Sequence, residues 1–211
     1  ATRITFVDIA GLVRGAAEGE GLGNQFLGSI REVDAIVHVL RCFEDSDITH
    51  VEGRIDPVSD AETVETELML ADLDSLERRV VPLRKRAQGG DKDIKEQVEL
   101  MDLALEALRD GRPARTASIP KGAEAAFAAL NLLTSKPVLY VCNVEEAAAA
   151  SGNSQSARVF AMAEKLGARA VVISAAIEAE VAQLDDAEQK EFLETLGLQE
   201  PGLDRLIRAG Y

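Results

Sequence analysis

The feature that most constrains the fold of this chain is a set of short apolar segments separated by helix-like stretches. Three are nearly continuous, and a fourth alternates before a glycine-rich loop: 35–41, 137–143, 168–174 and 3–8. Continuous apolar strands are typical of parallel sheets covered on both faces. Apolar residues recur at helical spacing in 24–31 and 156–166, and Gly167 follows as a stop signal. The β-α-β pattern predicts an α/β fold with a doubly wound, mainly parallel sheet.

The interval between the segments at 35–41 and 137–143 is too long for a simple crossover and predicts an insertion. Ser59 to Glu62 has the form of a capping box, so we expect a helix to begin there. Two heptad seams follow, one on each side of Gly89-Gly90. Their members are Met69, Leu73, Leu76, Val80, Leu83 and Ala87, then Ile94, Val98, Met101, Leu105 and Leu108. We expect an antiparallel coiled-coil hairpin, with a local bend at Pro82.

The rest of the chain is expected to return to the sheet and cover it. Residues 122–133 have apolar residues three apart and predict a helix, and amphipathic segments around 192–196 and 202–208 predict helices that pack on the sheet. The resulting domain prediction has three parts. They are 1–58, the first part of the sheet domain; 59–120, the helical insertion; and 121–211, the second part of the sheet domain.

Composition narrows the classes of function. The net charge of −14 argues against a broad nucleic-acid-binding surface, although a local basic patch remains compatible with it. There is neither a run of about 18 apolar residues nor a basic-then-apolar leader, so we expect no membrane partner and a cytoplasmic protein. Cys42 and Cys142 suggest reduced thiols, and together with His38 and His50 they give no metal-binding spacing.

A candidate nucleotide site begins with Asp8-Ile9-Ala10-Gly11. At the end of a strand, a carboxylate can hold a Mg²⁺-bound water, and a glycine N–H can approach a terminal phosphate because no Cβ blocks it. An ordinary tight turn can use the same residues, so the tetrapeptide alone leaves both interpretations open.

Two further motifs follow later predicted strands. Asn143-Val144-Glu145-Glu146 stands where P-loop proteins of the GTPase type have N-K-x-D, and Ser174-Ala175-Ala176 resembles the loop that backs the base. Glu146 replaces an aspartate, which moves the acceptor, so we expect weaker guanine recognition and access for adenine. Taken alone, Asn143 to Glu146 is also compatible with a plain helix start. Three motifs in order at strand ends favour a nucleotide site.

The chain closely resembles the YchF / Obg-like ATPase family, within the Obg group of translation-factor-related P-loop NTPases. The residues that carry the resemblance are Asp8–Ala16, Gly19–Leu27, Arg41–Phe43, Gly89–Asp93, Asn143 with Glu146, Leu198–Leu203 and Ile207–Tyr211. The resemblance implies a nucleotide-binding domain interrupted by a helical coiled coil, a preference for ATP over GTP, dependence on Mg²⁺ and association with ribosomes.

The resemblance also implies roles for individual residues. Asp8 would hold a Mg²⁺-bound water, Gly11 would contact the γ-phosphate, and Asn143, Val144 and Glu146 would surround the base, with Ser174, Ala175 and Ala176 behind it. Leu12 occupies the position where Ras-like enzymes have the glutamine that orients water. Leucine cannot do this, so no catalytic residue is assigned and hydrolysis should be slow.

The sequence also departs from the family pattern. It contains no G-x-x-x-x-G-K-[ST], no switch threonine, and no small β-rich TGS domain after Tyr211. We therefore expect an internal portion of a longer protein, with weak or no ATP hydrolysis on its own. The alternatives are a GTPase of the Obg group, or a non-enzymatic ribosome- or protein-binding module with nucleotide as a conformational ligand.

The tip of the predicted hairpin is basic. Residues 84–95 carry five positive and two negative side chains, a net +3, and the positive ones are Arg84, Lys85, Arg86, Lys92 and Lys95. They could contact RNA or the ribosome, or they could be an ordinary solvated turn whose basic residues favour a helix end.

Overall fold

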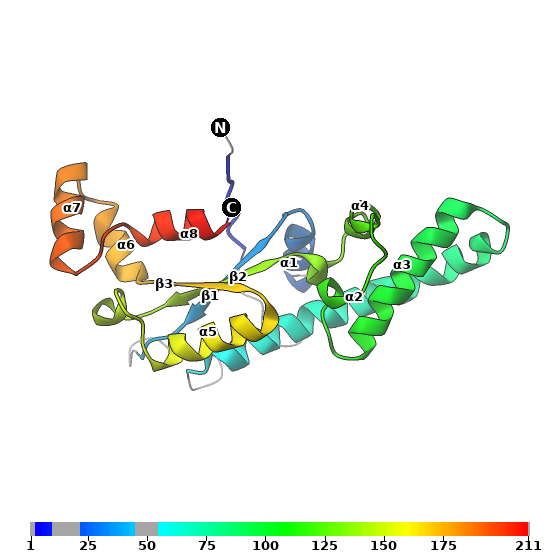
Figure 1. Cartoon of the computed structure of the whole chain (residues 1–211), viewed down its shortest axis with the longest axis horizontal. Coiled ribbons are helices and arrows are strands. Elements are labelled where there is room, and N and C mark those ends of the chain that lie inside the picture. Colours follow the sequence, from blue (N-terminus) through cyan, green and yellow to red (C-terminus); the bar gives the residue numbers. More distant parts are fainter. Residues whose placement is uncertain (1–2, 10–21, 45–54, 211) are drawn as a thin grey trace. The chain divides into compact units, whose positions relative to one another are not determined.

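The sheet of this protein is three-stranded and parallel. The structure, a computed structural model, describes residues 3–9, 22–44 and 55–210. Strands β1 (Ile36–Arg41), β2 (Val138–Asn143) and β3 (Arg169–Ile173) lie in the order β1-β2-β3, with Ile36 opposite Val138 and Leu139 opposite Arg169. Figure 1 shows these strands among many helices. The α/β fold and three of the four predicted strands are confirmed.

The fourth predicted strand, at 3–8, is wrong. Residues 3–9 have no regular secondary structure, and Phe6 and Val7 are 51% and 57% exposed. A strand forms only where a neighbouring strand accepts and donates its backbone hydrogen bonds. No described strand pairs with 3–9, so the alternation in the sequence is not expressed as a strand.

The described residues divide into two compact units. We call Ala1–Phe6, Ala35–Ala61 and Val138–Tyr211 the strand unit, because it contains all three described strands. We call Val7–Asp34 and Glu62–Pro137 the helical unit. The basic tip and both predicted heptad seams fall in the helical unit, whereas the two motifs after β2 and β3 fall in the strand unit.

One face of the sheet packs on helix α5 (Ser154–Leu166). Leu40, Tyr140 and Cys142 on the strands share a buried cluster with Val159 and Ala163 of α5. Asn153 caps the helix start through a capping box with Ser156, and Gly167 ends the helix in the left-handed conformation at φ 66°. The predicted helix and its stop signal are both confirmed.

The chain continues from β3 through three helices: α6 (Ala175–Val181), α7 (Asp186–Thr195) and α8 (Gly202–Gly210). In Figure 1, α8 lies on the side of the strands opposite α5. The Glu178 carboxylate of α6 accepts hydrogen bonds from the backbone N–H of Gly202 at 2.6 Å and of Leu203 at 3.2 Å. This carboxylate satisfies the open N–H groups at the start of α8 and favours its positive dipole end.

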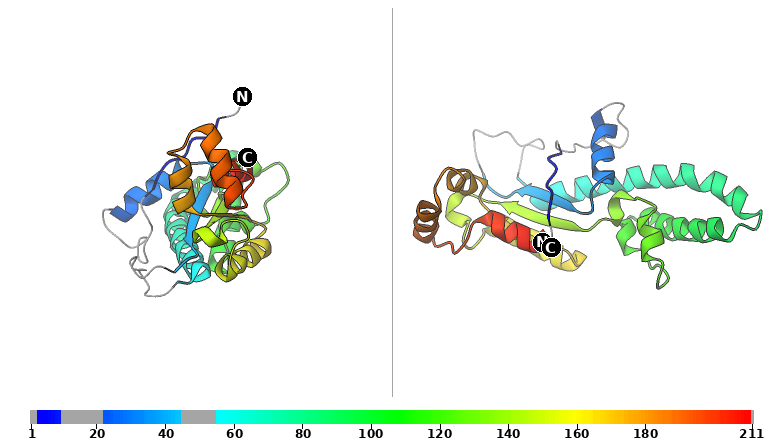
Figure 2. Two further views of the ribbon diagram at one scale, coloured as in Figure 1. Left: turned by 90° about the vertical axis from the view of Figure 1, so that its left-hand side faces the viewer. Right: turned by 90° about the horizontal axis from the view of Figure 1, so that it is seen from above.

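In the helical unit, α2 (Pro57–Ala87, which begins in the strand unit) and α3 (Lys92–Arg109) form an antiparallel pair. All eleven predicted seam residues belong to one apolar cluster with parts of the following segment. Ion pairs join Arg109 to Glu77 and Arg84 to Asp102, so rising numbers on one helix meet falling numbers on the other. Figure 2 shows the two helices side by side.

The boundaries of α2 refine the prediction. The helix begins two residues before Ser59, because the Asp56 carboxylate accepts a hydrogen bond from the Ser59 N–H at 3.2 Å and Pro57 suits a first helical turn. The helix continues through Pro82 to Ala87. At the turn, Gly90 has φ 91°, a conformation that glycine adopts without strain, and Asp91 then caps α3.

The helix predicted at 122–133 is largely wrong. Only α4 (Glu124–Ala128) is helical there, followed by a 3-10 turn at Leu133–Ser135. Asn131 has φ 56°, which ends any right-handed helix at that point. The short helix α1 (Leu22–Arg31) precedes β1 and contributes buried Leu27 and Ile30, as its spacing predicted.

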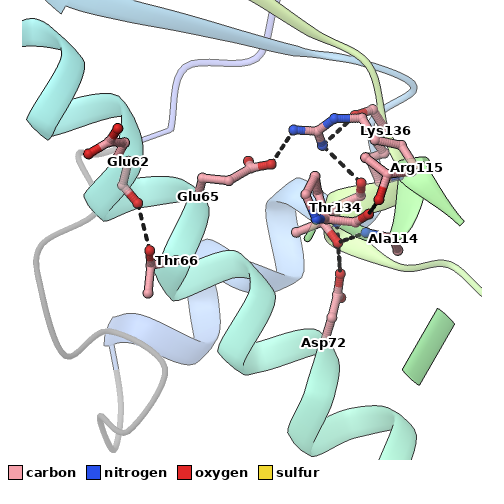
Figure 3. Close-up of polar contacts among 10 residues, drawn as sticks. Glu62, Glu65, Thr66, Asp72, Ala114, Arg115, Thr134 and Lys136 are labelled. Atoms are coloured by element: carbon pink, nitrogen blue, oxygen red, sulfur yellow. Dashed lines mark hydrogen bonds and ion pairs between the residues drawn. The ribbon is translucent and has the colours of Figure 1, made fainter. Parts of the chain in front are cut away.

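A buried carboxylate organises the segment after α3. Asp72 of α2 is fully buried and accepts hydrogen bonds from the N–H groups of Leu133 and Thr134 and from the Thr134 hydroxyl, at 2.7–2.8 Å. The Thr134 hydroxyl oxygen also accepts from Ala114 N–H at 2.9 Å. Figure 3 shows this group beside Arg115, which pairs with Glu65. These contacts fix a turn that would otherwise leave its backbone groups unsatisfied.

Candidate functional site

The two predicted base loops are joined by the side chain of Asn143. Its Oδ1 atom accepts a hydrogen bond of 2.9 Å from the backbone N–H of Ala175, across the ends of β2 and β3. Backbone bonds reinforce the junction: Val144 N–H donates to Ile173 C=O at 2.9 Å, and Cys42 N–H donates to Asn143 C=O at 2.8 Å. Sequence positions 32 residues apart therefore form one surface at the carboxyl ends of the strands.

Ser174 differs from the two alanines that follow it. Its side chain is 2% exposed, and its Oγ accepts from Ile177 N–H at 3.5 Å, which makes it the N-cap of α6. Ala175 and Ala176 are exposed at the start of the helix. Ser174 thus shapes the loop, while the alanines present small side chains against which a flat ring can lie.

Glu146 and Val144 have opposite environments. Glu146 is exposed in a 3-10 turn (Glu146–Ala148), and its carboxylate has no hydrogen bond or ion pair with any described residue. Val144 is 2% exposed and packs in the interior cluster that contains Cys142 and Val159. Glu146 is therefore available as an acceptor for a base, whereas the Val144 side chain supports the fold and could meet a base only through its backbone.

Asn153 belongs to this surface and was missed by the sequence interpretation. Its Nδ2 donates to the Cys42 C=O at 2.6 Å and to the Glu145 carboxylate at 2.9 Å, while its Oδ1 caps α5. It thereby ties the ends of β1 and β2 to the start of α5. In the sequence, an asparagine three residues before Ser156 at a helix start indicates a helix cap. It does not indicate the contact with Cys42, which lies 111 residues away.

The phosphate side of the predicted site is only partly described. Asp8 is exposed and makes no hydrogen bond or ion pair with a described residue. Gly11 and Leu12 lie outside the described residues. An exposed carboxylate is the hard oxygen donor that suits a Mg²⁺-bound water, so Asp8 fits the predicted role, although one carboxylate is not a complete site. Within the described ranges, no group of three or more His, Cys, Asp or Glu side chains could hold a metal.

The basic tip is exposed on both helices. Arg84, Lys85 and Arg86 lie in the last turn of α2, and Lys92 and Lys95 lie in the first turns of α3. Arg84 pairs with Asp102. The other four form no ion pair with the described part of the chain, so their charge is available to an anionic partner.

Three titratable groups lie in or next to β1 and β2: half-buried His38 in β1, buried Cys142 in β2 and buried Cys42 directly after β1. Burial lowers the pKa of His38 to about 4, against the smaller opposing effect of Asp60. The nearby Cys142 thiol, together with burial, raises the pKa of Cys42. Both cysteines are free and buried, so they are unreactive thiols that contribute to the core. Among the described helices, none is long and apolar enough to cross a membrane.

Comparisons with known proteins identify the family of the chain. The family described as 50S ribosome-binding GTPase matches residues 1–75. The chain is 52% identical over 210 residues to the ribosome-binding ATPase YchF of Pasteurella multocida, and 46% identical over 212 residues to that of Bacillus subtilis. In both cases the match covers 100% of this chain and 58% of the relative, so the chain spans little more than half of these proteins.

A solved structure is also similar. The YchF GTPase of Schizosaccharomyces pombe superposes with a TM-score of 0.79 at 29% identity, over 92% of this chain and 53% of that one. The similarity extends over both the strands and the helical hairpin, because so little of the chain is left unmatched.

Proposed function

Because the chain belongs to the YchF / Obg-like ATPase family, we propose that it forms the base-reading and partner-contacting portion of an ATP-binding molecular switch that acts on or near the ribosome. Residues 1–58 and 121–211 belong to the nucleotide domain in this proposal, and 59–120 to an inserted arm. A cytoplasmic location follows from such a partner.

The observation that carries the proposal is the Asn143–Ala175 hydrogen bond, with Glu146 exposed beside it. A purine presents both donors and acceptors at its edge, so recognition requires a fixed loop and an accessible acceptor. Asn143 fixes the loop, Glu146 accepts from the exocyclic amine, and Ala175 and Ala176 back the ring. The longer reach of glutamate favours adenine over guanine.

Asp8 and Gly11 take the phosphate side of the proposed site. Asp8 would hold Mg²⁺ through a bound water, and the ion would neutralise charge on the phosphates. Leu12 provides no group to orient water, so hydrolysis is slow. No P-loop motif occurs in the 211 residues, and we expect weak or no hydrolysis by this chain alone.

The base-reading step can be tested by NMR. Millimolar adenosine nucleotides added to the ¹⁵N-labelled chain should shift the amides of Asn143, Glu146, Ala175 and Ala176 more than guanosine nucleotides do. Glu146→Gln should remove the difference, whereas Glu145→Gln, at the neighbouring exposed carboxylate, should keep it. Shifts confined to other parts of the chain would contradict the base-reading step. Micromolar Mg-ATP affinity of the chain alone would contradict the expectation of weak or no hydrolysis without the P-loop.

GTP is the alternative substrate, because the matching family and the yeast relative are both described as GTPases. Glu146→Asp shortens the acceptor toward the usual guanine-reading geometry and should raise GTP affinity. Val144→Lys is unsuitable as a companion change, since it would bury a cation in the cluster under β2.

The basic tip supports a non-enzymatic module as a second candidate function. Four exposed cations without an ion pair to the described chain, at the end of a helical hairpin, suit an anionic surface such as ribosomal RNA. Ribosome binding that persists without nucleotide would favour this candidate, and binding that requires ATP would favour the switch.

A further inference from the structure

The outer edge of β3 is open in the described structure. The sheet order is β1-β2-β3, and no described strand lies beyond β3. In a parallel strand, alternate residues direct their N–H and C=O groups to opposite neighbours. Ile173 C=O accepts from Val144 N–H at 2.9 Å, so the backbone N–H and C=O groups of Ile173, Val171 and Arg169 point toward β2. The backbone groups of Ala170 and Val172 therefore face away from β2, toward the open edge.

A hollow of about 320 Å³ lies along this edge. It is lined by Val171 and Val172 of β3, Phe160 of α5, Arg205 of α8 and the loop 150–152. Phe160 is 43% exposed although it is a large apolar side chain. The strand edge, an apolar ring and a cation thus meet in one place within the strand unit.

The cation in this hollow lacks a partner. The Nε atom of Arg205 is buried and forms no hydrogen bond with a described residue. Among the described residues, no other buried side-chain nitrogen or oxygen lacks a hydrogen-bond partner. A buried donor without an acceptor is unfavourable, and more so when it is charged. Arg169, on the same face of β3 as Val171, is exposed and has no ion pair with the described chain either. The site therefore needs an anionic acceptor.

We propose that the open edge of β3 receives an extended acidic peptide, which adds as a fourth strand and places a carboxylate on Arg205. The N–H and C=O groups of Ala170 and Val172 bind its backbone. Because side chains alternate along a strand, one side chain in two reaches the Arg169 and Arg205 side, and the next reaches Phe160. The peptide that fits alternates acidic and apolar residues.

Charge complementarity selects this occupant. The chain as a whole carries −14, yet Arg169 and Arg205 leave two unpaired cations beside a strand edge. A basic or neutral strand would leave the Arg205 donor unsatisfied. The proposal is independent of the nucleotide site, because neither Asn143 nor Glu146 lines the hollow.

The probe is an eight-residue peptide of alternating Glu and Val, acetylated and amidated at its ends, added to the ¹⁵N-labelled chain. We expect slower hydrogen exchange at the Ala170 and Val172 amides, with shifts extending to Phe160. Arg205→Gln should weaken binding by about tenfold, the effect of one charge-assisted hydrogen bond. Arg208→Gln, at an exposed arginine on the same helix, should leave it unchanged.

The backbone contact has its own test. Val172→Pro removes the N–H that faces the peptide while leaving the bonds to β2, so it should abolish binding. If that variant does not fold, the same peptide N-methylated at alternate residues tests the contact on the unchanged chain, and it should not bind. Equal binding of a Lys-Val peptide, or an unchanged affinity of Arg205→Gln, would overturn the proposal.

Self-association is the competing outcome. Sedimentation equilibrium without peptide should show a monomer. A dimer that Val172→Pro dissolves would overturn the peptide as occupant and assign the edge to a second copy of the chain.

Discussion

The amide oxygen of Asn143 lies 2.9 Å from the backbone nitrogen of Ala175 and accepts its hydrogen bond. This bond makes the end of β2 and the start of α6 one surface. It also means that Asn143 has a structural role that can be measured without any ligand.

Asn143→Ala should lower the free energy of unfolding by about 1–2 kcal/mol, because the Ala175 N–H loses its acceptor. Urea denaturation measures the loss, and amide exchange should locate it at Ala175. Glu146→Ala is the matched control: it lies on the same loop but is exposed, so stability should change by less than about 0.5 kcal/mol. Equal losses in the two variants would show that the bond is not what stabilises the loop.

Asp72→Asn should destabilise the helical unit by about 2–3 kcal/mol. The substitution keeps the volume, but an NH₂ group replaces one of the two oxygens and cannot accept, so either the Leu133 donor or the two Thr134 donors lose their acceptor. Asp74→Asn makes the same chemical change two residues away, at an exposed carboxylate paired with Arg78, and should cost under about 0.5 kcal/mol. Calorimetry compares the two, and similar melting temperatures would argue against the role of Asp72.

The free energy of unfolding should decrease as the pH falls, because of His38. Its folded-state pKa of about 4 lies below its ordinary value of 6.5, so the unfolded chain binds the proton more readily. The stabilisation is therefore complete above pH 6.5 and is lost as the pH falls toward 4, by about 3 kcal/mol at most. Between pH 6.5 and 4, the denaturation midpoint of the parent protein should fall more steeply with decreasing pH than that of His38→Gln. Parallel pH profiles would rule out His38 as the cause.

Gly202→Ala should destabilise the strand unit by about 1–3 kcal/mol. A Cβ at this position would lie 2.6 Å from the Glu178 carboxylate oxygen and 2.9 Å from Ile173 Cγ2. Gly28→Ala serves as the control, since nothing lies within 4 Å of a Cβ there and the residue is inside α1. That change should stabilise slightly, by about 0.5–1 kcal/mol. In thermal melts, we expect Gly202→Ala to lower the melting temperature and Gly28→Ala to raise it.

In the proposed function the hairpin tip contacts the ribosome, so charge reversal at the tip should weaken ribosome binding. Lys85, Arg86 and Lys92 are suitable sites because they are exposed and form no ion pair with a described residue, whereas changing Arg84 would also break its pair with Asp102. Replacing all three by Glu should reduce co-sedimentation with ribosomes at least about tenfold and flatten its dependence on salt.

The control for the tip reverses three exposed lysines elsewhere, which makes the same change in net charge. They are Lys121, Lys165 and Lys190. Similar losses in both triple variants would mean that overall charge, and not the tip, governs the interaction.

The parts of the fold that could be predicted are those that depend on local periodicity. The runs at 35–41, 137–143 and 168–174 became β1, β2 and β3, and the heptad seams lie in one cluster, because apolar spacing directly reports burial. The segment 3–8 was mispredicted because alternation cannot show whether a neighbouring strand is present.

Contacts between distant residues could not be predicted. The helix expected at 122–133 stops early because Asn131 adopts φ 56° and Asp72, about 60 residues away, binds the turn. At the candidate site, strand-end motifs led to Asn143 and Ser174. The contact of Asn153 with Cys42 joins residues 111 apart and leaves no local pattern, and the unpaired Arg205 looks like any surface arginine in sequence.

The two thiols have a kinetic consequence. Cys42 and Cys142 are the only cysteines of the chain, both are buried, and both lie in the strand unit. A thiol-specific reagent can reach them only when β1 and β2 open, because both thiols are buried in the folded chain. The rate of labelling in the unmodified protein therefore measures the opening of the strand unit, which contains both thiols.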